Sequence, residues 1–482
     1  MRRRRSCSST LPFALWLASA LASAGELPRE HACPTFAGLP EAGAAQDASA
    51  ERVVEGMVLT RADALRLSAL LPAEVWRHRD VFFHDGMQMR IGACHRRYPP
   101  PRAYQRATEQ FAGQAKLDSD GNLSNYTAGL PFPPGSIDPG APDAGVRWAW
   151  NLELRHRGAG PSGRFRIADL PHDGDEQASL GVWFQLQMAH RADLAPPGQS
   201  GSNAALRAWI AGGRFSEPGD ARGLAWQQTR ADASARDASL PDDVFVYLPR
   251  LGKVRRAASA WVDGLYLPGY RAAGAPTGGV IPVGGSARGS GGAINAAGAS
   301  IAVTEHLARG FTALSIRPNA YAWRVLGVRE VVAPLNAARS GFPSDPLRNF
   351  GPSGLSLGDD RWDVRQAIAI QGALRERSRG DAWLTLYVDT ETAQPLYWIS
   401  ERRGDRRVGV GILLHRWSGD QPGYPAWPDG EPAAVFDPAA AVFYDERDQG
   451  GWRRESYDAR STPLPEEELR YRTSAAFLER GG

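Results

Sequence analysis

Two acidic clusters are the residues of this sequence whose types and spacing come closest to a cation site. The first consists of His172, Asp173, Asp175 and Glu176, and the second of Asp359, Asp360 and Asp363. Carboxylate oxygens are the ligands that hard cations prefer. Neither cluster has the ordered spacing of a calcium-binding loop, so both are predicted to be solvated acidic turns, and no metal site is expected.

Several common motifs for catalysis are absent from the chain. It has no P-loop, no H-E-x-x-H and no C-x-x-C. Gly409 and Gly411 lack the third glycine of a dinucleotide-binding turn and lie in a strand pattern. The sequence therefore predicts no catalytic residue and no cofactor. A hydrolase that uses two carboxylates stays open, because such residues need only meet in space.

The abundant aromatic residues indicate a different role. The chain has 15 Trp, 16 Phe and 13 Tyr, many at alternating positions of candidate strands. A wide curved sheet with apolar side chains on its concave face can enclose a hydrophobic pocket, although each aromatic could equally belong to a packed core. The aromatic residues predicted on this basis to bind a ligand are Trp148, Trp150, Phe184, Phe245, Tyr247, Trp323, Trp362, Trp383, Tyr387 and Trp398.

The elements that would position these side chains are short strands divided by Gly, Pro and Asp. Trp148 and Trp150 lie two apart and are expected on one face of a strand. Further strands are predicted over 164–167, 180–190, 224–231, 244–248, 327–332, 362–374, 381–388, 395–402, 409–417, 442–445 and 452–457. This spacing is typical of hairpins and a meander rather than of βαβ units.

Helices are predicted near the two ends of the chain. Thr60 resembles an N-cap with Asp63 three positions later, Leu67 and its neighbours supply an apolar stripe, and Pro72 ends that helix. A second helix is predicted over 103–114, and a short terminal helix follows an exposed connector over 463–468. The fold class predicted is mainly β with a few helices (α+β), built on one large curved antiparallel sheet.

The N-terminus has the three-part layout of a secretory signal. Four arginines, residues 2–5, precede an apolar run from Leu11 to Leu21 and a small-x-small cleavage site at residues 22–24. The apolar run is too short to form a permanent transmembrane helix. A signal peptide over 1–24 predicts export to a bacterial periplasm, and no transmembrane segment is expected after cleavage.

Removal of this segment changes the charge balance. The whole chain carries a net charge of +3, and residues 1–24 hold four arginines and no acid. The mature chain therefore has a net charge of about −1. No basic excess is left to neutralise phosphates, which argues against binding to nucleic acid.

Two cysteines remain after cleavage, Cys33 and Cys94. In an oxidising compartment they can form a disulfide, and the alternative is two separate thiols. The domain organisation predicted is an extended arm over 25–50, a single domain over 51–460 and a C-terminal tail over 461–482. A Gly-rich insertion over 274–298 is either a disordered loop or a flap over a site.

Several short blocks resemble a bacterial family known as domain of unknown function 1329, described as outer-membrane lipoprotein-sorting-like. The blocks occur in one order and cover roughly Val53 to Trp417. They are residues 128–133 with Trp150-Asn151, residues 247–249 with 254–257, residues 321–336 after Phe311, residues 361–365 and residues 387–392. The Gly-rich stretch interrupts the pattern between Arg256 and Phe311, and both mature cysteines lie outside the matched blocks.

The resemblance implies a fold like that of periplasmic lipoprotein carriers, an incomplete β-barrel with helices at its mouth. Such carriers hold acyl chains and hand them on, and family members are associated with transporters of the resistance-nodulation-division type. Arg255 and Arg256 follow a strand and are predicted to bind a lipid phosphate at the rim, or else to form ordinary salt bridges.

The sequence therefore favours a periplasmic carrier, not an enzyme, for a lipid or other hydrophobic ligand. Its location could also be peripheral to the outer membrane. Two alternatives are kept, a non-catalytic adaptor that docks to an envelope transport complex and an envelope hydrolase. A barrel interior filled by side chains would favour the adaptor.

Overall fold

In the computed structural model, the residues described are 33, 53–83, 85–170, 176–197, 207–257, 264–268, 311, 314–343, 360–375, 382–402, 405–427, 429–448 and 451–479. The predicted signal peptide, the arm apart from Cys33 and the Gly-rich segment over 274–298 lie outside these residues. Within this part of the chain, no helix has both the length and the apolar character needed to cross a membrane.

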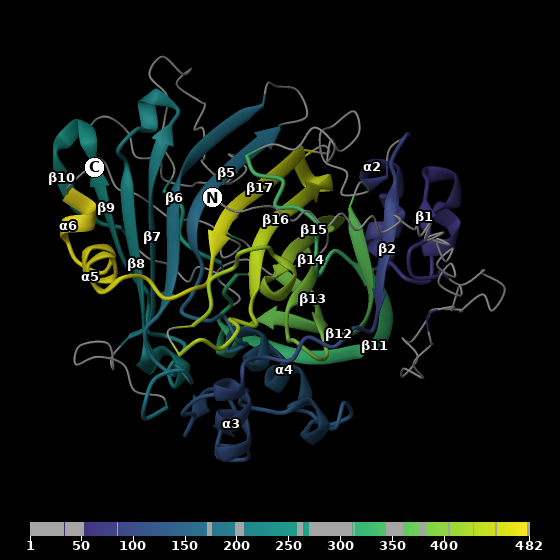
Figure 1. The fold of residues 1–482 in the computed structure, drawn as a ribbon, viewed down its shortest axis with the longest axis horizontal. Helices are drawn as coiled ribbons and strands as arrows, with labels where there is room; N and C mark the ends of the chain where they lie inside the picture. Colours follow the sequence, from purple (N-terminus) through teal and green to yellow (C-terminus); the bar gives the residue numbers. More distant parts are fainter. Residues whose placement is uncertain are drawn as a thin grey trace, which may run out of the picture. The chain divides into compact units, whose positions relative to one another are not determined.

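One large sheet forms most of the described structure (Figure 1). Its strands pair in the order β1-β2-β12-β13-β14-β15-β16-β17-β5-β6-β7-β8-β9-β10, with β11 on the free side of β12. All strand pairs are antiparallel except β2 with β12, so the sheet is mixed where a purely antiparallel one was predicted. The mainly β fold with an open, curved sheet is confirmed.

The strands of the sheet extend well beyond some of the predicted ranges and match others to within one residue. They are β1 (Val58–Leu59), β2 (Met89–Cys94), β5 (Ser162–Leu170), β6 (Gln177–Gln187), β7 (Arg207–Glu217), β8 (Ala225–Ala231), β9 (Asp243–Leu248), β10 (Lys253–Arg256), β11 (Tyr321–Ala333), β12 (Arg361–Leu374), β13 (Ala382–Asp389), β14 (Pro395–Arg402), β15 (Asp405–Trp417), β16 (Phe436–Asp445) and β17 (Gly451–Arg460). A separate hairpin joins β3 (Lys116–Leu117) and β4 (Leu123–Ser124).

Among the strands that were not predicted, β2 and β7 have an apolar pattern that glycine interrupts. In β7, a Cβ on Gly213 would lie 2.3 Å from the Trp226 ring. In β2, a Cβ on Gly92 would lie 2.1 Å from the Asp363 carboxylate. Glycine weakens a strand's sequence pattern, yet here it admits a large neighbour that a side chain would exclude.

The prediction that Trp148 and Trp150 lie on a strand is wrong, because both belong to helix α4 (Ala144–Glu153). Almost every residue of α4 is buried, on all sides of the helix. A short apolar run that is buried all round has no helical periodicity to distinguish it from a strand. Both rings contribute to one core together with Trp323, Trp398 and other residues of the sheet.

The other helices lie near the predicted positions. A 3₁₀ helix, η1 (Arg61–Leu67), begins with the expected capping box between Thr60 and Asp63. Helix α3 (Arg102–Gln110) confirms the second predicted helix. The C-terminal helices are α5 (Glu466–Arg472) and α6 (Ala476–Glu479), and two short helices that were not predicted are α1 (Ala73–Arg77) and α2 (Arg79–Phe82).

A disulfide joins Cys33 to Cys94 at the end of β2, which confirms the predicted pairing. The two cysteines are 61 residues apart in sequence. In the chain-entropy picture, closing a loop of this size stabilises the fold by about 4 kcal/mol.

Helices α3 and α4 lie at one end of the sheet, where α4 packs against β11 and β12 (Figure 1). The approach is close, since a Cβ on Gly145 would lie 2.9–3.0 Å from backbone atoms of Arg324 in β11. Backbone atoms cannot move aside as a flexible side chain could, so the position of α4 depends on this glycine.

Gly145→Ala is expected to lower the free energy of unfolding by about 1–3 kcal/mol, because the added methyl group forces α4 away from β11. Chemical denaturation followed by tryptophan fluorescence measures this change. Gly135→Ala is the matched control, since nothing lies within 4 Å of its added Cβ. Equal stability of the two variants would contradict the close approach of α4.

Candidate ligand-binding site

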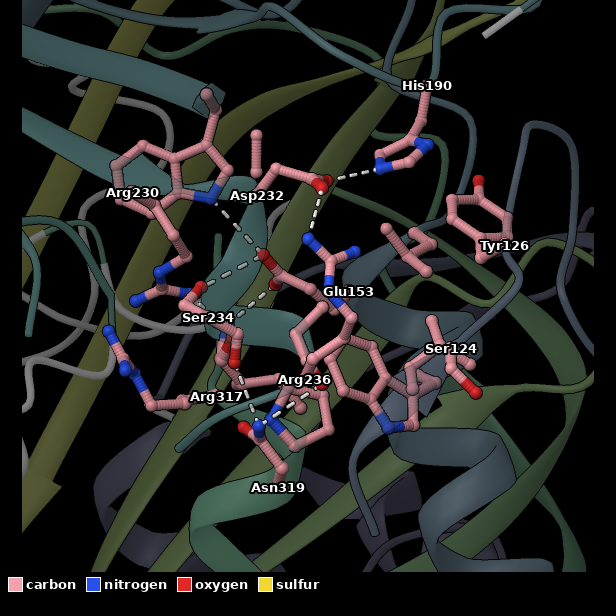
Figure 2. A pocket seen from close by; sticks show the side chains of 18 of the residues that line it. Ser124, Tyr126, Glu153, His190, Arg230, Asp232, Ser234, Arg236, Arg317 and Asn319 are labelled. Atoms are coloured by element: carbon pink, nitrogen blue, oxygen red, sulfur yellow. Dashed lines mark hydrogen bonds and ion pairs between the residues drawn. The ribbon is translucent and has the colours of Figure 1, made fainter. Parts of the chain in front are cut away.

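Two adjoining cavities lie where α3 and α4 meet the ends of β6, β7 and β8. The larger has a volume of about 540 Å³ and the smaller, shown in Figure 2, about 50 Å³. Both are lined by Tyr126, Glu153, Leu154, Gln187 and His190. The larger volume is within the range of small-molecule sites.

The walls of the larger cavity come from elements distant in sequence. Helix α3 contributes Tyr104 and Ala107, the loop after β6 contributes Leu194, and Trp427 closes the opposite side. The Tyr104 hydroxyl donates a hydrogen bond of 2.9 Å to the Leu154 carbonyl, which fixes α3 against the end of α4. Apolar wall surface of this kind suits a hydrophobic body on a ligand.

Glu153, the last residue of α4, is the centre of the polar floor (Figure 2). Its Oε1 accepts hydrogen bonds from the Ser315 hydroxyl at 2.8 Å and from Trp209 Nε1 of β7 at 3.3 Å. Its Oε2 accepts from the Ile316 amide at 2.8 Å and from Arg157 Nη2 at 3.1 Å. One buried carboxylate thus connects α4, β7 and the segment that leads into β11.

A second buried carboxylate, Asp242, stands behind this floor. It accepts from Arg317 at 2.6 Å and from two nitrogens of Arg230 at 3.0 and 3.1 Å. Burial raises the pKa of Asp242, but the two guanidinium groups outweigh burial and hold that pKa below its usual value. The carboxylate therefore stays charged at neutral pH.

Arg155 adds a buried positive charge to the floor. Its nitrogens donate to Gln394 Oε1 at 2.9 Å and to the carbonyls of Leu152 and Leu314. These acceptors are neutral, and no carboxylate of the described residues lies within ion-pair distance of Arg155. Burial, together with the charge of Arg157, lowers the Arg155 pKa.

His190 and Asp232 form a close pair in the smaller cavity (Figure 2), with Nε2 at 2.6 Å from Oδ1. The other ring nitrogen, Nδ1, lies 2.8 Å from the Thr127 carbonyl. Both nitrogens are thus engaged, and neither is left to accept a proton from a serine or a water. This pair fastens the loop after β6 and gives no support to the envelope hydrolase.

The twelve residues predicted to bind a ligand are not brought together. Trp150 lines the smaller cavity, and none of the twelve lines the larger one. Trp148, Trp323 and Trp398 pack in the core that contains α4, whereas Trp362 and Tyr387 belong to the core on the opposite face of the sheet. Phe184 and Tyr247 pack with α6 on the outer face of β6–β9, and Trp383 is half-buried.

The predicted rim residues lie at β9 and the edge strand β10. Phe245, Arg255 and Arg256 are exposed, and Arg256 forms an ion pair with Asp243. The Arg256 contact corresponds to the ordinary salt bridge that the sequence left open.

The described members of the two acidic clusters contact other protein groups. Glu176 pairs with Arg166, while residues 171–175 lie outside the described part. Asp363 accepts from the Tyr98 hydroxyl at 2.8 Å, and Asp360 from the Ala338 amide. Among the residues described, no group of three or more His, Cys, Asp or Glu is placed to hold a metal ion.

Sequence reasoning missed the residues of the polar floor. The run Arg155-His156-Arg157 is visible in the sequence directly after α4, but α4 was interpreted as a strand. Asp242, Arg230 and Arg317 have no spacing that signals their meeting. A cluster of basic residues at the end of an apolar helix was the one available signal.

The described architecture is that of a mainly β protein with an open, curved sheet and a cavity beside its helices. Residues 80–270 match the model of the family described as protein of unknown function (DUF1329). This segment is therefore similar to the family that the ordered sequence blocks resemble. A search of curated proteins found no match.

Solved structures similar to the chain include an outer membrane lipoprotein-sorting protein domain from Vibrio parahaemolyticus, with 13% identity and a TM-score of 0.38. A DUF1329 family protein from Desulfovibrio piger has 12% identity and a TM-score of 0.38. A LolA superfamily protein from Nitrosomonas europaea has 12% identity and a TM-score of 0.31. The matches cover 70%, 71% and 70% of this chain, and 100%, 100% and 98% of the respective structures.

The pH dependence of stability that His415 of β15 contributes tests whether the region around Arg155 is buried. Burial lowers the His415 pKa to about 3, and the charge of Arg155 adds to this. A lowered histidine pKa contributes stability that is complete above the unfolded value near 6.5 and is lost as pH falls toward the folded value. At about pH 4.5 the expected loss is about 2–3 kcal/mol.

His415→Gln removes this titration, so its free energy of unfolding is expected to fall less than that of the wild type between pH 7 and about pH 4.5. Chemical denaturation at the two pH values measures both slopes. The comparison within each protein removes any constant effect of the substitution. Identical slopes would show that His415 is not held neutral.

Proposed function

We propose that this protein is a periplasmic carrier that binds a lipid or other hydrophobic molecule and does no chemistry on it. The observation that carries the proposal is the cavity of about 540 Å³ with apolar walls from α3, the loop after β6 and Trp427. The predicted signal peptide and the similarity to the DUF1329 family support the periplasmic location. A transporter of the resistance-nodulation-division type is the partner that the family resemblance implies.

We place the ligand at the end of the sheet where α3 and α4 lie. The inner face of β5–β9 is packed with buried rings, among them Trp183, Trp226 and Phe311, whose centroids lie 4.7–6.4 Å apart. Such close ring packing leaves no room for an acyl chain between these groups. The space that a ligand needs lies beside α3 and α4.

The packed inner face also favours the second candidate, a non-catalytic adaptor for an envelope transport complex. The two functions differ in whether the large cavity takes up a ligand. An adaptor would use the outside of the sheet and would leave the cavity filled with water.

Ligand uptake can be tested with N-phenyl-1-naphthylamine, a neutral apolar dye whose fluorescence rises in a hydrophobic site. We expect saturable binding to the mature protein, and we expect native mass spectrometry of protein purified from its own periplasm to detect a bound lipid. Protein that is consistently bare and does not bind the dye would favour the adaptor.

Ala103→Trp tests whether the dye occupies this cavity, because Ala103 of α3 lines it and a large ring there fills the space. The variant is expected to bind the dye at least about tenfold more weakly, a change of about 1.4 kcal/mol. Arg102→Trp is the matched control, since its exposed side chain on the same helix does not line the cavity. Equal binding by both variants would place the dye elsewhere.

A further inference from the structure

The floor of the large cavity carries an excess of buried positive charge. Three charged residues between 6% and 8% exposed line it: Glu153, Arg155 and Arg157. The two arginines outnumber the one carboxylate, so this cluster has a formal charge of +1. Buried charges are normally matched by partners of opposite sign, because a desolvated charge without one is costly.

Arg157 is the member of this cluster whose hydrogen bonds are incomplete. Its Nη2 donates to the Glu153 carbonyl at 2.7 Å and to the Glu153 carboxylate at 3.1 Å. Its Nε and Nη1 are buried and have no hydrogen-bond partner among the described residues. Arg157 also lines the large cavity.

The neighbouring His156 does not supply the charge. Burial lowers the His156 pKa to about 4, so its ring is neutral at neutral pH. Its Nε2 also has no hydrogen-bond partner among the described residues, and it lines the same cavity. The positive character of the floor comes from the arginines.

The remaining charges around the cavity lie nearer to its rim. Arg191 and Asp193 form an ion pair with each other. Arg106 and Asp429 are exposed, and Glu431 is partly exposed. Exposed charges are screened by water and salt, so they offset little of the charge at the buried floor.

We propose that the large cavity recognises an anionic group, a carboxylate or a phosphate, which accepts a hydrogen bond from Arg157. This inference rests on the proposed carrier function and specifies its ligand as an anionic amphiphile. A hydrogen bond from a guanidinium to such a group is charge-assisted and therefore stronger than a neutral hydrogen bond. The apolar walls then hold the hydrophobic body of the same molecule.

Displacement of N-phenyl-1-naphthylamine at neutral pH compares decanol, decanoic acid and decyl phosphate, which share one apolar chain and differ in charge. The two anions are expected to displace the dye at concentrations at least about tenfold lower than decanol does. Equal potency of all three would overturn the anion proposal and leave the carrier function standing. Failure of all three to displace the dye, without binding of inorganic phosphate, would overturn both.

Inorganic phosphate distinguishes the two sources of the anionic group. If phosphate alone displaces decanoic acid and Arg157→Gln abolishes this competition, a free anion can occupy the site. If phosphate does not compete while decyl phosphate binds tightly, the site requires an amphiphile. Each result supports recognition of an anion by Arg157 and identifies its source.

Arg157→Gln tests the residue directly and is expected to reduce the preference for decanoic acid over decanol to about one. Arg157→Lys is expected to retain part of the preference, because it keeps the positive charge but loses the planar guanidinium group and its N–H donors. Arg102→Gln removes an exposed arginine of α3 that does not line the cavity and is expected to behave like the wild type. An unchanged preference in Arg157→Gln would overturn the proposal, and the wild-type comparison decides it if that variant does not fold.

Discussion

The buried carboxylate of Glu153 is the interaction on which the helical end of the structure depends. A charge in this surrounding is tolerated only when hydrogen bonds and opposite charges replace the water it has lost. Glu153 obtains them from β7, from the segment before β11 and from Arg157. The need to satisfy one carboxylate therefore places α4 relative to strands that are distant from it in sequence.

Hydrogen bonds and ion pairs of this kind also join some of the sequence blocks that resemble the family. Asn151 donates to the Phe132 carbonyl at 2.6 Å and accepts from the Phe132 amide at 3.1 Å, so the two parts of the first matched block meet as one unit. Arg365 pairs with Asp389 at 2.7 Å and with Glu391 at 3.0 Å, which joins the last two blocks. Residues of this kind stabilise the fold, so their match to the family pattern does not by itself mark a ligand site.

The fold was more predictable than the site for a physical reason. Strands such as β12 and β15 have long runs of apolar and β-branched residues between turn residues, and the Thr60–Asp63 capping box is a local signal. The pairing of Glu153 with Ser315, or of Asp242 with Arg317, is set by tertiary contacts that no local pattern records. Helix α4 was misassigned because burial on every side removes the periodicity on which such assignments depend.

The floor and the walls of the large cavity are formed by different kinds of segment. Its floor belongs to buried side chains tied into the sheet, whereas its walls come from α3 and the loop after β6. A substitution in the walls can change which apolar body fits without disturbing the charges beneath, while a substitution in the floor also affects the fold. Under the proposed carrier function, variation in α3 and this loop would change the apolar body that fits and leave the polar floor unchanged.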